Sequence, residues 1–313
     1  MSDTKFSLVI PVYMNEESIP DLLSVLTEIN ISMSARLEVV FVVDGSPDNC
    51  YEILADRLTT VPFHSQLLLH SRNYGSFAAV RTGLEVAKGT FFAVMAADLQ
   101  EPPALVIDFF NCLEADEADI ILGARESRQD PLLSRFLSNV YWRFYSKFII
   151  PDIPKGGVDV FACNLQFRSK LLELQECHTS LIGLIYWLGF RRKTLIYSRC
   201  VRKHGKSAWT FGRKVTYFMD SVFAFTDLPI RLLILSGSVG LLISVIFALL
   251  LILAKISGNL TVPGYAATVV AVLFFGGLNA VGLGIIGSYI WRAYGNTQQR
   301  PSAVVMRKTT FNN

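Results

Sequence analysis

The sequence predicts an α/β domain with a doubly wound sheet, followed by amphipathic helices and two membrane-spanning helices near the end of the chain. Short runs of β-branched and other apolar residues alternate with helical patterns over the first 130 residues. This alternation is typical of a mostly parallel sheet with helices on both faces. Two long apolar stretches lie within residues 232–291. The 313 residues suffice for one such domain and a membrane anchor.

The predicted strands are short and strongly apolar. They cover residues 6–12, 37–43, 66–70, 91–95 and 118–123, and helical patterns lie between them at 16–29, 48–58 and 77–88. In such a sheet, ligands bind at the carboxyl ends of the strands. We therefore expect the functional residues directly after the strands.

Two apolar stretches, residues 232–254 and 265–291, each exceed the roughly 20 residues that a helix needs to cross a bilayer. Lys255 is the only charged residue between Arg231 and Arg292. Basic residues lie before the first stretch and after the second, whereas the link 257–264 carries no charge. The positive-inside rule then predicts a two-span membrane protein with both termini in the cytosol.

The net charge is only +3, from 29 basic and 26 acidic residues. No acidic residue follows Arg231, so the part before the spans is nearly neutral and the charge indicates no nucleic-acid partner. Residues 292–313 are predicted to form a basic cytosolic tail beside the membrane.

Aromatic and basic residues recur at helical spacing in two segments before the first span. The first segment begins at Pro131 and carries Phe136, Leu137, Val140, Tyr141, Phe144, Tyr145 and Phe148 with Arg135, Arg143 and Lys147 between them. The second carries Val215, Phe218, Met219, Val222 and Phe223 and ends at Pro229. Both helices would suit the membrane interface, and the adjacent anchor favours this placement over that of ordinary core-facing helices.

Polar residues follow the first two predicted strands. Pro11, Tyr13 and Glu16 lie where the first strand ends, and Asp44 and Gly45 lie where the second ends. Gly45 permits a tight turn there, and Asp44 can accept hydrogen bonds from a base or ribose. Such positions suit a nucleotide, although a plain turn before a helix cap fits each segment equally well.

The strongest local signal is Asp98, which directly follows an apolar strand and precedes the pair Pro102-Pro103. A divalent cation that bridges nucleotide diphosphate oxygens takes one or two carboxylates and water as ligands. We therefore expect Asp98, helped by Gln100, to bind Mg²⁺ or Mn²⁺. The alternative is that Asp98 only caps the next helix.

A basic segment precedes the second amphipathic helix. It contains Arg199, Arg202, Lys206 and Ser207. Arginine gives bidentate contacts to phosphate oxygens and a serine hydroxyl adds a neutral donor, so the segment would suit a lipid phosphate. The alternative is a surface loop that anionic lipids attract without specificity.

These motifs together resemble the polyisoprenyl-phosphate branch of glycosyltransferase family 2, which includes dolichol-phosphate mannosyltransferases and bactoprenol glucosyltransferases. The resemblance spans nearly the whole chain, and two C-terminal spans look most like the bactoprenol subgroup. The matching stretches are PVYMNEE from Pro11, VDGSPD from Val43, SRNYG from Ser71, ADLQEPP from Ala97, GGVD from Gly156 and RCVRKHGKSAW from Arg199.

The resemblance implies a GT-A-type Rossmann-like domain with its nucleotide-sugar-binding core at residues 1–130. Pro11, Tyr13, Glu16, Asp44 and Asp98 would line the donor site, with Asp98 on the metal; Arg72 and Asn73 match the family's third motif. Residues 131–231 would form the acceptor side, 232–291 the two-helix anchor and 292–313 the tail. One departure is Ala96, where the family usually has the first aspartate of Asp-x-Asp.

Asp159 falls where the family carries an aspartate regarded as a catalytic base. A phosphate monoester is already largely ionised at neutral pH and needs little deprotonation before it attacks an anomeric carbon. Asp159 could instead orient the donor sugar or stabilise the oxocarbenium-like transition state.

The implied activity is inverting transfer of a hexose from a UDP-sugar, such as UDP-glucose, to undecaprenyl phosphate at the cytosolic face of the plasma (inner) membrane. A processive polysaccharide synthase is a rival, but the chain lacks its Gln-x-x-Arg-Trp motif and its further helices. A non-catalytic membrane protein that kept the fold is another rival, for which Ala96 is the hint. Glycines at 276, 277, 282, 284 and 287 would permit close helix contacts and self-association.

Overall fold

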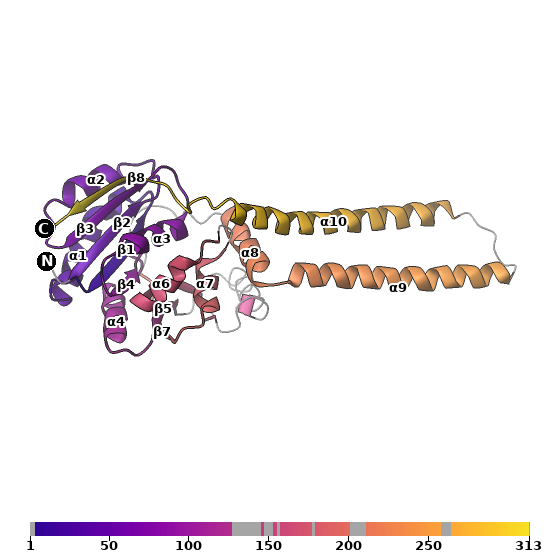
Figure 1. The fold of residues 1–313 in the computed structure, drawn as a ribbon, viewed down its shortest axis with the longest axis horizontal. Coiled ribbons are helices and arrows are strands. Elements are labelled where there is room, and N and C mark those ends of the chain that lie inside the picture. Colours follow the sequence, from indigo (N-terminus) through magenta and orange to yellow (C-terminus); the bar gives the residue numbers. More distant parts are fainter. Residues whose placement is uncertain are drawn as a thin grey trace.

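A computed structural model describes residues 4–126, 145–146, 153–154, 157–176, 179–200, 211–257 and 264–312. Its strands are β1 (Phe6–Val12), β2 (Leu37–Val43), β3 (His64–His70), β4 (Phe91–Val94), β5 (Ile120–Arg125), β6 (Val158–Asn164), β7 (Arg192–Tyr197) and β8 (Val305–Phe311). Its helices are η1 (Glu16–Ser18), α1 (Ile19–Ser32), α2 (Cys50–Arg57), α3 (Ser76–Val86), α4 (Pro103–Glu114), α6 (Leu165–Glu173), α7 (Leu181–Trp187), α8 (Phe211–Phe225), α9 (Leu228–Ile256) and α10 (Tyr265–Thr297). Figure 1 shows the sheet and its helices at one end and α9 and α10 extending away from them.

The eight strands form one sheet in the order β7-β5-β6-β4-β1-β2-β3-β8. Strands β4, β1, β2 and β3 are parallel, and every residue of β2 is buried. Such continuous burial arises because helices cover both faces of the sheet. One buried cluster holds residues of α1, α2 and α4, and the other holds residues of α3, α6 and α7. The predicted α/β fold class is therefore confirmed.

The five predicted strands are present, with small shifts at their ends, but three further strands were not predicted. Strand β6 runs antiparallel between β4 and β5, and β7 runs parallel to β5 at one edge of the sheet. At the other edge, β8 pairs antiparallel with β3. Because of these strand directions, the carboxyl ends of β1 to β5 and of β7 lie on the same side of the sheet as the first residues of β6 and β8.

Strand β8 changes the description of the C-terminal tail. Residues 292–313 were expected to form a basic tail beside the membrane, but Val305–Phe311 returns to the sheet and pairs with β3 (Figure 1). The strand is rich in β-branched residues, and the outer edge of β3 offers backbone groups that need partners. Arg307 and Lys308 remain exposed on the added strand.

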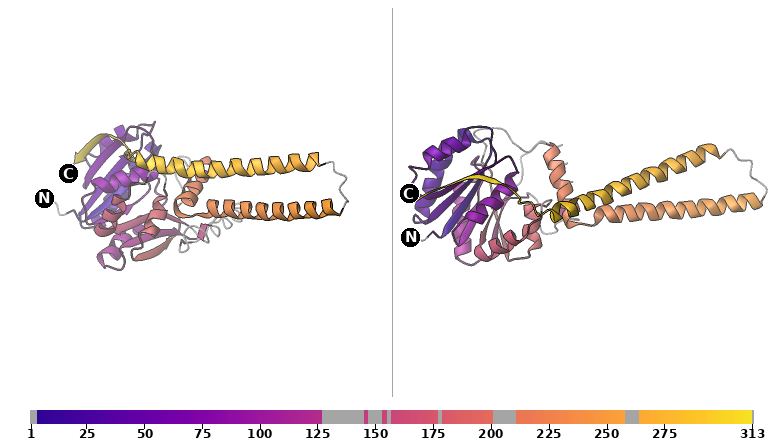
Figure 2. Two further views of the ribbon diagram at one scale, coloured as in Figure 1. Left: turned by 45° about the vertical axis from the view of Figure 1, so that its right-hand side comes forward. Right: turned by 45° about the horizontal axis from the view of Figure 1, so that its top comes forward.

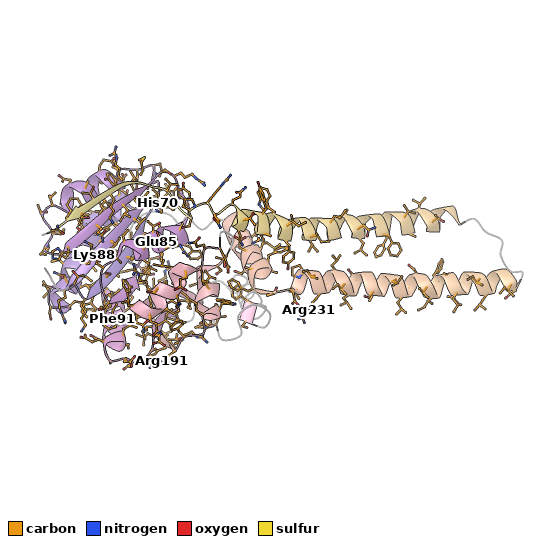
Figure 3. All side chains as sticks on the ribbon, viewed as in Figure 1. His70, Glu85, Lys88, Phe91, Arg191 and Arg231 are labelled. Carbon is orange, nitrogen blue, oxygen red and sulfur yellow. The ribbon has the colours of Figure 1, made fainter. Side chains whose placement is uncertain are left out.

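Helices α9 and α10 form a hairpin that projects from the domain in all views (Figures 1 and 2). Their segments Leu228–Leu250 and Phe274–Thr297 are long and apolar enough to cross a membrane. Apolar side chains point outward along both helices, and Arg231 lies at the start of α9 (Figure 3). The two helices contact each other where Gly240 faces the ring of Phe275 and Gly282 faces Leu233.

Helix α8 is the second predicted amphipathic helix, and one of its faces packs against the sheet domain. Val222 is buried in the domain core, and the buried hydroxyl of Tyr145 donates to that of Ser221 at 3.1 Å. The ring of Phe225 covers Gly183 of α7. The first predicted amphipathic helix, beginning at Pro131, lies outside the described residues except for Tyr145 and the residue after it.

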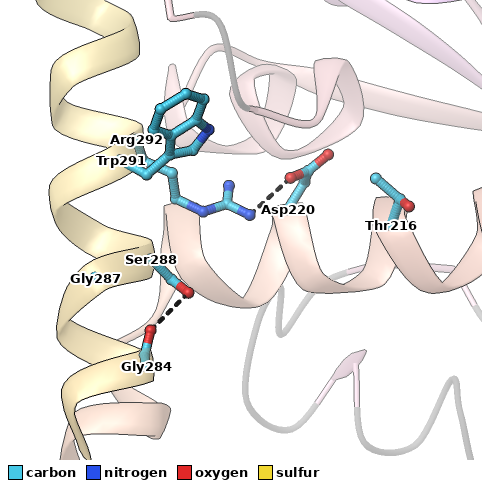
Figure 4. A pocket seen from close by; sticks show the side chains of 7 residues that line it. All are labelled: Thr216, Asp220, Gly284, Gly287, Ser288, Trp291 and Arg292. Atoms are coloured by element: carbon cyan, nitrogen blue, oxygen red, sulfur yellow. Dashed lines mark hydrogen bonds and ion pairs between the residues drawn. The ribbon is translucent and has the colours of Figure 1, made fainter.

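The other side of α8 contacts α10, the second helix of the hairpin. Arg292 of α10 donates to Asp220 of α8 at 2.8 Å (Figure 4). Its guanidinium also lies over the ring of Phe223. Phe223 also meets Tyr289 edge to face, at 5.1 Å between ring centroids. Met219 remains exposed. Helix α8 therefore links the sheet domain to the hairpin of α9 and α10.

We expect Gly183→Ala to loosen α8 from the domain, because a Cβ at Gly183 would lie 2.2 to 2.9 Å from ring atoms of Phe225. Overpacking of this kind costs about 1–3 kcal/mol. Thermal unfolding in detergent should show a lower Tm for this variant. Gly212→Ala near the start of α8 is the control, since no heavy atom outside its own helix lies within 4 Å of the added Cβ. An equal Tm for Gly183→Ala and wild type would contradict this account.

Candidate active site

Asp44, at the end of β2, is the most enclosed of the predicted site residues. Its side chain is buried and accepts a hydrogen bond from Nδ1 of His70 at 2.8 Å. It also accepts from the backbone N–H groups of Tyr74 at 2.8 Å and Gly75 at 2.7 Å. His70 lies at the end of β3 (Figure 3), and its Nε2 lies 3.1 Å from the hydroxyl of Thr82. Asp44 thus fixes the loop that follows β3; its predicted contact to a base or ribose stays a prediction.

The 71–75 loop, which carries the third motif, packs directly on the turn after Asp44. Gly45 adopts φ +56°, and a Cβ there would lie 2.2 Å from the carbonyl carbon of Arg72 and 2.6 Å from the backbone nitrogen of Asn73. Only glycine fits both the conformation and the close approach. The guanidinium of Arg72 lies 4.3 Å from the ring centroid of Tyr74. The predicted donor residues Arg72 and Asn73 therefore lie beside Asp44.

The loops after β1 and β2 are tied together by reciprocal contacts. The carboxylate of Glu16 accepts from the backbone N–H of Asn49 at 2.9 Å, and the N–H of Glu16 donates to Asp48 at 3.2 Å. Asp48 also accepts from Ser46 at 2.6 Å. Although burial opposes it, this set of hydrogen bonds lowers the pKa of Asp48. Glu16, predicted to line the donor site, thus braces the two loops in this structure.

The β1 end also holds Pro11 and Tyr13, the other predicted donor residues. Both are half-buried, and the N–H of Tyr13 donates to the side chain of Asn15 at 3.3 Å. Met14, between them and Glu16, has φ +54°, a left-handed conformation that is uncommon outside glycine. This conformation turns the chain sharply after the strand, and the N–H of Met14 donates to Ser46 at 2.8 Å.

Asp98 lies in a second sharp turn, at the end of β4. Leu99 has φ +55°, and the N–H of Gln100 donates back to the carboxylate of Asp98 at 3.3 Å. The turn brings Glu101 beside Asp98. Glu101 is buried, and its carboxylate accepts from the N–H of Ala96 at 3.2 Å. Burial, with the nearby charges of Asp98 and Asp159, raises the pKa of Glu101 to about 7.

The beginning of the basic segment lies against this acidic turn. The guanidinium of Arg199 donates to Oε1 of Gln100, and the N–H of Cys200 donates to the Gln100 carbonyl at 2.9 Å. Burial and the charge of Arg125 lower the pKa of Arg199, against the opposing charges of Asp159, Asp98 and Glu101. Arg199, predicted for the acceptor side, therefore lies next to the predicted metal ligands Asp98 and Gln100.

Asp159, near the start of β6, is held by residues from the neighbouring strand β5 and from β7, the next strand beyond it. The guanidinium of Arg125, at the end of β5, makes a two-pronged contact to its carboxylate, with one bond at 2.7 Å. The hydroxyl of Tyr197, at the end of β7, donates to the same carboxylate at 3.0 Å. Burial opposes the charge of Arg125, but the hydrogen bonds that Arg125 donates to Asp159 and the charge of Asp159 raise its pKa. Burial and the charges of Asp159 and Glu101 raise the pKa of Tyr197.

The sequence reasoning missed three residues of this cluster: Glu101, Arg125 and Tyr197. Glu101 lies inside the ADLQEPP stretch, three residues after Asp98, so the motif itself contained the signal. Arg125 is the last residue of β5 and Tyr197 the last residue of β7, and both strands bring them next to Asp159. Asp159 is distant from both in the sequence, so no local pattern indicates the contact. The predicted acceptor residues Arg202, Lys206 and Ser207 lie outside the described residues.

The site thus combines two parts along one sheet edge. The loops after β1, β2 and β3 form a braced platform, and Asp98, Glu101 and Asp159 form an acidic cluster with Arg125 and Arg199. Within the described ranges, no group of three metal-ligating side chains converges on one point. A single carboxylate with a diphosphate and water is the arrangement that a nucleotide-bound Mg²⁺ commonly takes.

Comparisons with known proteins agree with this geometry. Residues 7–174 match the family model described as Glycosyl transferase family 2. A Bacillus subtilis protein named as the glycosyltransferase CsbB is 32% identical over 97% of this chain and 92% of its own length. The undecaprenyl-phosphate 4-deoxy-4-formamido-L-arabinose transferase of Yersinia pestis is 31% identical over 97% and 93%. The prophage bactoprenol glucosyl transferase homolog of Escherichia coli is 27% identical over 97% and 99%.

Among solved structures, the mannosyltransferase PcManGT of Pyrobaculum calidifontis, in complex with GDP-Man and Mn²⁺, matches with a TM-score of 0.50. The match covers 92% of this chain and 87% of that chain at 18% identity, so it shows the fold alone. The family model covers more than half of the chain, and relatives above 30% identity cover nearly all of it. The chain is therefore a glycosyltransferase and belongs to glycosyltransferase family 2.

Proposed function

We propose that this enzyme transfers a hexose from a nucleotide sugar, UDP-glucose or a similar UDP-sugar, to undecaprenyl phosphate at the cytosolic face of the plasma membrane. The observation that carries the proposal is the contact of Arg199 with Gln100. It joins the acidic turn of a nucleotide-sugar enzyme to the basic segment that leads into α8, and α8 packs on the membrane hairpin. Two relatives whose names include undecaprenyl phosphate or bactoprenol support this acceptor.

The residues around Asp98 fit a divalent cation. Burial and the charge of Asp98 raise the pKa of Glu101, and a cation bound between the two carboxyl groups would offset this repulsion. Asp98 would hold Mg²⁺ or Mn²⁺. Gln100, the other predicted ligand, accepts a hydrogen bond from Arg199 through Oε1, so it would have to leave that contact to bind the cation. Bound there, the cation supplies the positive charge that stabilises a departing nucleoside diphosphate. The Mn²⁺ in the complex of PcManGT agrees with this chemistry.

Asp159 is better suited to positioning than to proton abstraction. Its carboxylate is paired with Arg125 and accepts from Tyr197, so its oxygens are engaged in holding these two side chains. A lipid phosphate is already largely ionised and needs no strong base. Asp159 would therefore orient Arg125 and the donor sugar, while the phosphate attacks the anomeric carbon in one displacement with inversion.

The hairpin of α9 and α10 would place the active site at the membrane surface. Helix α10 leads into β8, which belongs to the catalytic sheet, so the segment after the second span and the catalytic domain share one side of the membrane. The charge pattern assigns that side to the cytosol. The spans would hold the active site at headgroup depth, where the lipid phosphate resides.

We expect Asp98→Asn to reduce transfer by at least about two orders of magnitude, because charge stabilisation of the leaving diphosphate is lost. Wild-type activity should likewise vanish in EDTA and return with Mg²⁺ or Mn²⁺. Asp108→Asn, which changes an exposed carboxylate of α4, is the matched control. Radiolabelled sugar transferred to undecaprenyl phosphate is the measurement. Full activity in EDTA would refute the metal assignment.

We expect the 257–264 link between the spans to lie outside the cytosol and Asn313 inside. In a background without other cysteines, Asn259→Cys should react with a membrane-impermeant thiol reagent in intact cells, and Asn313→Cys should react only after lysis. Mass-shift labelling checks both. Reaction at residue 313 but not at residue 259 in intact cells would reverse the topology.

We expect Arg202→Ala to slow transfer by one to two orders of magnitude, because charge-assisted contacts to the lipid phosphate contribute roughly 1.5 to 3 kcal/mol. Arg202→Lys should recover only part of the rate, since an ammonium lacks the guanidinium fork. Nucleotide-sugar affinity, measured by calorimetry, should stay unchanged. Arg57→Ala at the exposed end of α2 is the control. If Arg202→Ala lost affinity for the nucleotide sugar while the transfer rate kept its dependence on lipid concentration, the basic segment would belong to the nucleotide site instead.

A further inference from the structure

The segment that returns from the membrane hairpin contacts the 71–75 loop directly. Just before β8 begins, the carbonyl of Val304 accepts a hydrogen bond from the backbone N–H of Ser71 at 3.0 Å. Ser71 directly follows β3, the strand on which β8 pairs, with Arg307 opposite Leu69 and Val305 opposite His70. After a shift of register between Leu69 and His70, the pairing of β3 with β8 is extended into the loop by the Ser71 contact.

Tyr74 provides a second link between the loop and Val304. Its hydroxyl lies 3.1 Å from that of Ser71, and the backbone of Val304 lies beside the same hydroxyl. The hydrogen bond with Ser71 lowers the pKa of Tyr74, and the Val304 backbone adds to this effect, as an N–H facing the hydroxyl does. Val304 therefore binds the loop through its carbonyl and faces it with its N–H. The ring of Tyr74 in turn supports the guanidinium of Arg72.

The opposite side of the same loop faces the site. The N–H groups of Tyr74 and Gly75 bind the buried carboxylate of Asp44, and Gly45 lies against Arg72 and Asn73. The loop is thereby clamped between the turn after β2 and the segment before β8. Removing one side of a clamp lets the loop move without changing the residues that line the site.

We propose that Val304 and Tyr74 are positioning residues for the nucleotide sugar: the segment returning from the membrane holds the 71–75 loop, and with it Arg72 and Asn73, in the donor-binding arrangement. The inference rests on the proposed function, in which this loop lines the donor site. It assigns the C-terminal segment a part in donor binding. Because α10 ends at Thr297 and β8 begins at Val305, only a short connection separates the membrane helix from this contact.

The test compares Tyr74→Phe, Val304→Pro and the double variant with wild type. Tyr74→Phe removes the hydroxyl but keeps the ring under Arg72, and Val304→Pro removes the N–H but keeps the carbonyl that Ser71 needs. Tyr51→Phe is the matched control, because it makes the same chemical change on α2 at a ring that lies 5.9 Å from the guanidinium of Arg307 on β8. Steady-state transfer from UDP-glucose to undecaprenyl phosphate, UDP binding by calorimetry and Tm are measured for each protein.

Each single variant should raise the KM for UDP-glucose about 5–10-fold and weaken UDP binding by a similar factor, while kcat stays within about twofold. The double variant should resemble the singles, because both changes break one shared contact. Tyr51→Phe should match wild type. Unchanged UDP affinity in both single variants, or a fall in kcat and Tm at constant KM, would overturn the positioning role. A wild-type protein that binds UDP but transfers no sugar would refute the proposed acceptor or sugar, and UDP affinity alone would then decide the positioning role.

Discussion

The loops after β2 and β3 depend for their geometry on the hydrogen bonds of the buried Asp44 carboxylate. A charged group without water must have its oxygens hydrogen-bonded, or the cost of burial would unfold the site. Here the partners come from the end of β3 and from the start of α3, namely His70, Tyr74 and Gly75. One side chain thus fixes two strand ends and a helix start. Hydrogen bonds to a charged group contribute about 1.5–3 kcal/mol each, which makes this arrangement stiff.

On the acidic side of the site, a buried carboxyl group lies beside another carboxylate and not beside several donors. Burial of Glu101 and the charge of Asp98 therefore raise the pKa of Glu101. Arg199 and Arg125 bring positive charge to the same turn. The surrounding contacts hold Leu99 in its uncommon left-handed conformation. If the loops after β1 to β3 bind the nucleotide, as proposed, its diphosphate and cation would reach this turn.

Much of the fold could be predicted because its signal is local. Each of β1 to β5 is a short apolar run, and polar residues such as Asp44 and Asp98 follow directly at the strand ends. Strands β6 and β7 contain the polar residues Asp159, Arg192 and Lys193, so their pattern resembles that of loops. These polar residues are tolerated because β7 is an edge strand and Asp159 lies at the site edge, where Arg125 and Tyr197 bind it. No spacing in the sequence indicates such partners.

Strand β8 shows a different limit of sequence reasoning. A short segment with Arg307 and Lys308, after a membrane span, has the composition of a juxtamembrane tail, and charge alone favours that interpretation. Its strand becomes apparent only once the outer edge of β3 is known to need a partner. The same holds for Arg199. Its charge indicated a phosphate, but its contact with Gln100 depends on how the segment after β7 reaches the turn after β4.

The return of the chain to the sheet also explains why the membrane hairpin and the catalytic domain should act as one unit. A domain joined to its anchor through one linker could tilt freely at the headgroups. Here the chain leaves the domain through α8 and comes back through β8, and α8 is fastened to α10 by Asp220 and Arg292. Two covalent connections and one ion pair restrict the tilt of the site relative to the bilayer. In the proposed reaction the acceptor is a lipid phosphate at a fixed depth, so its attack on an anomeric carbon in the site would require that the site keep a fixed height above it.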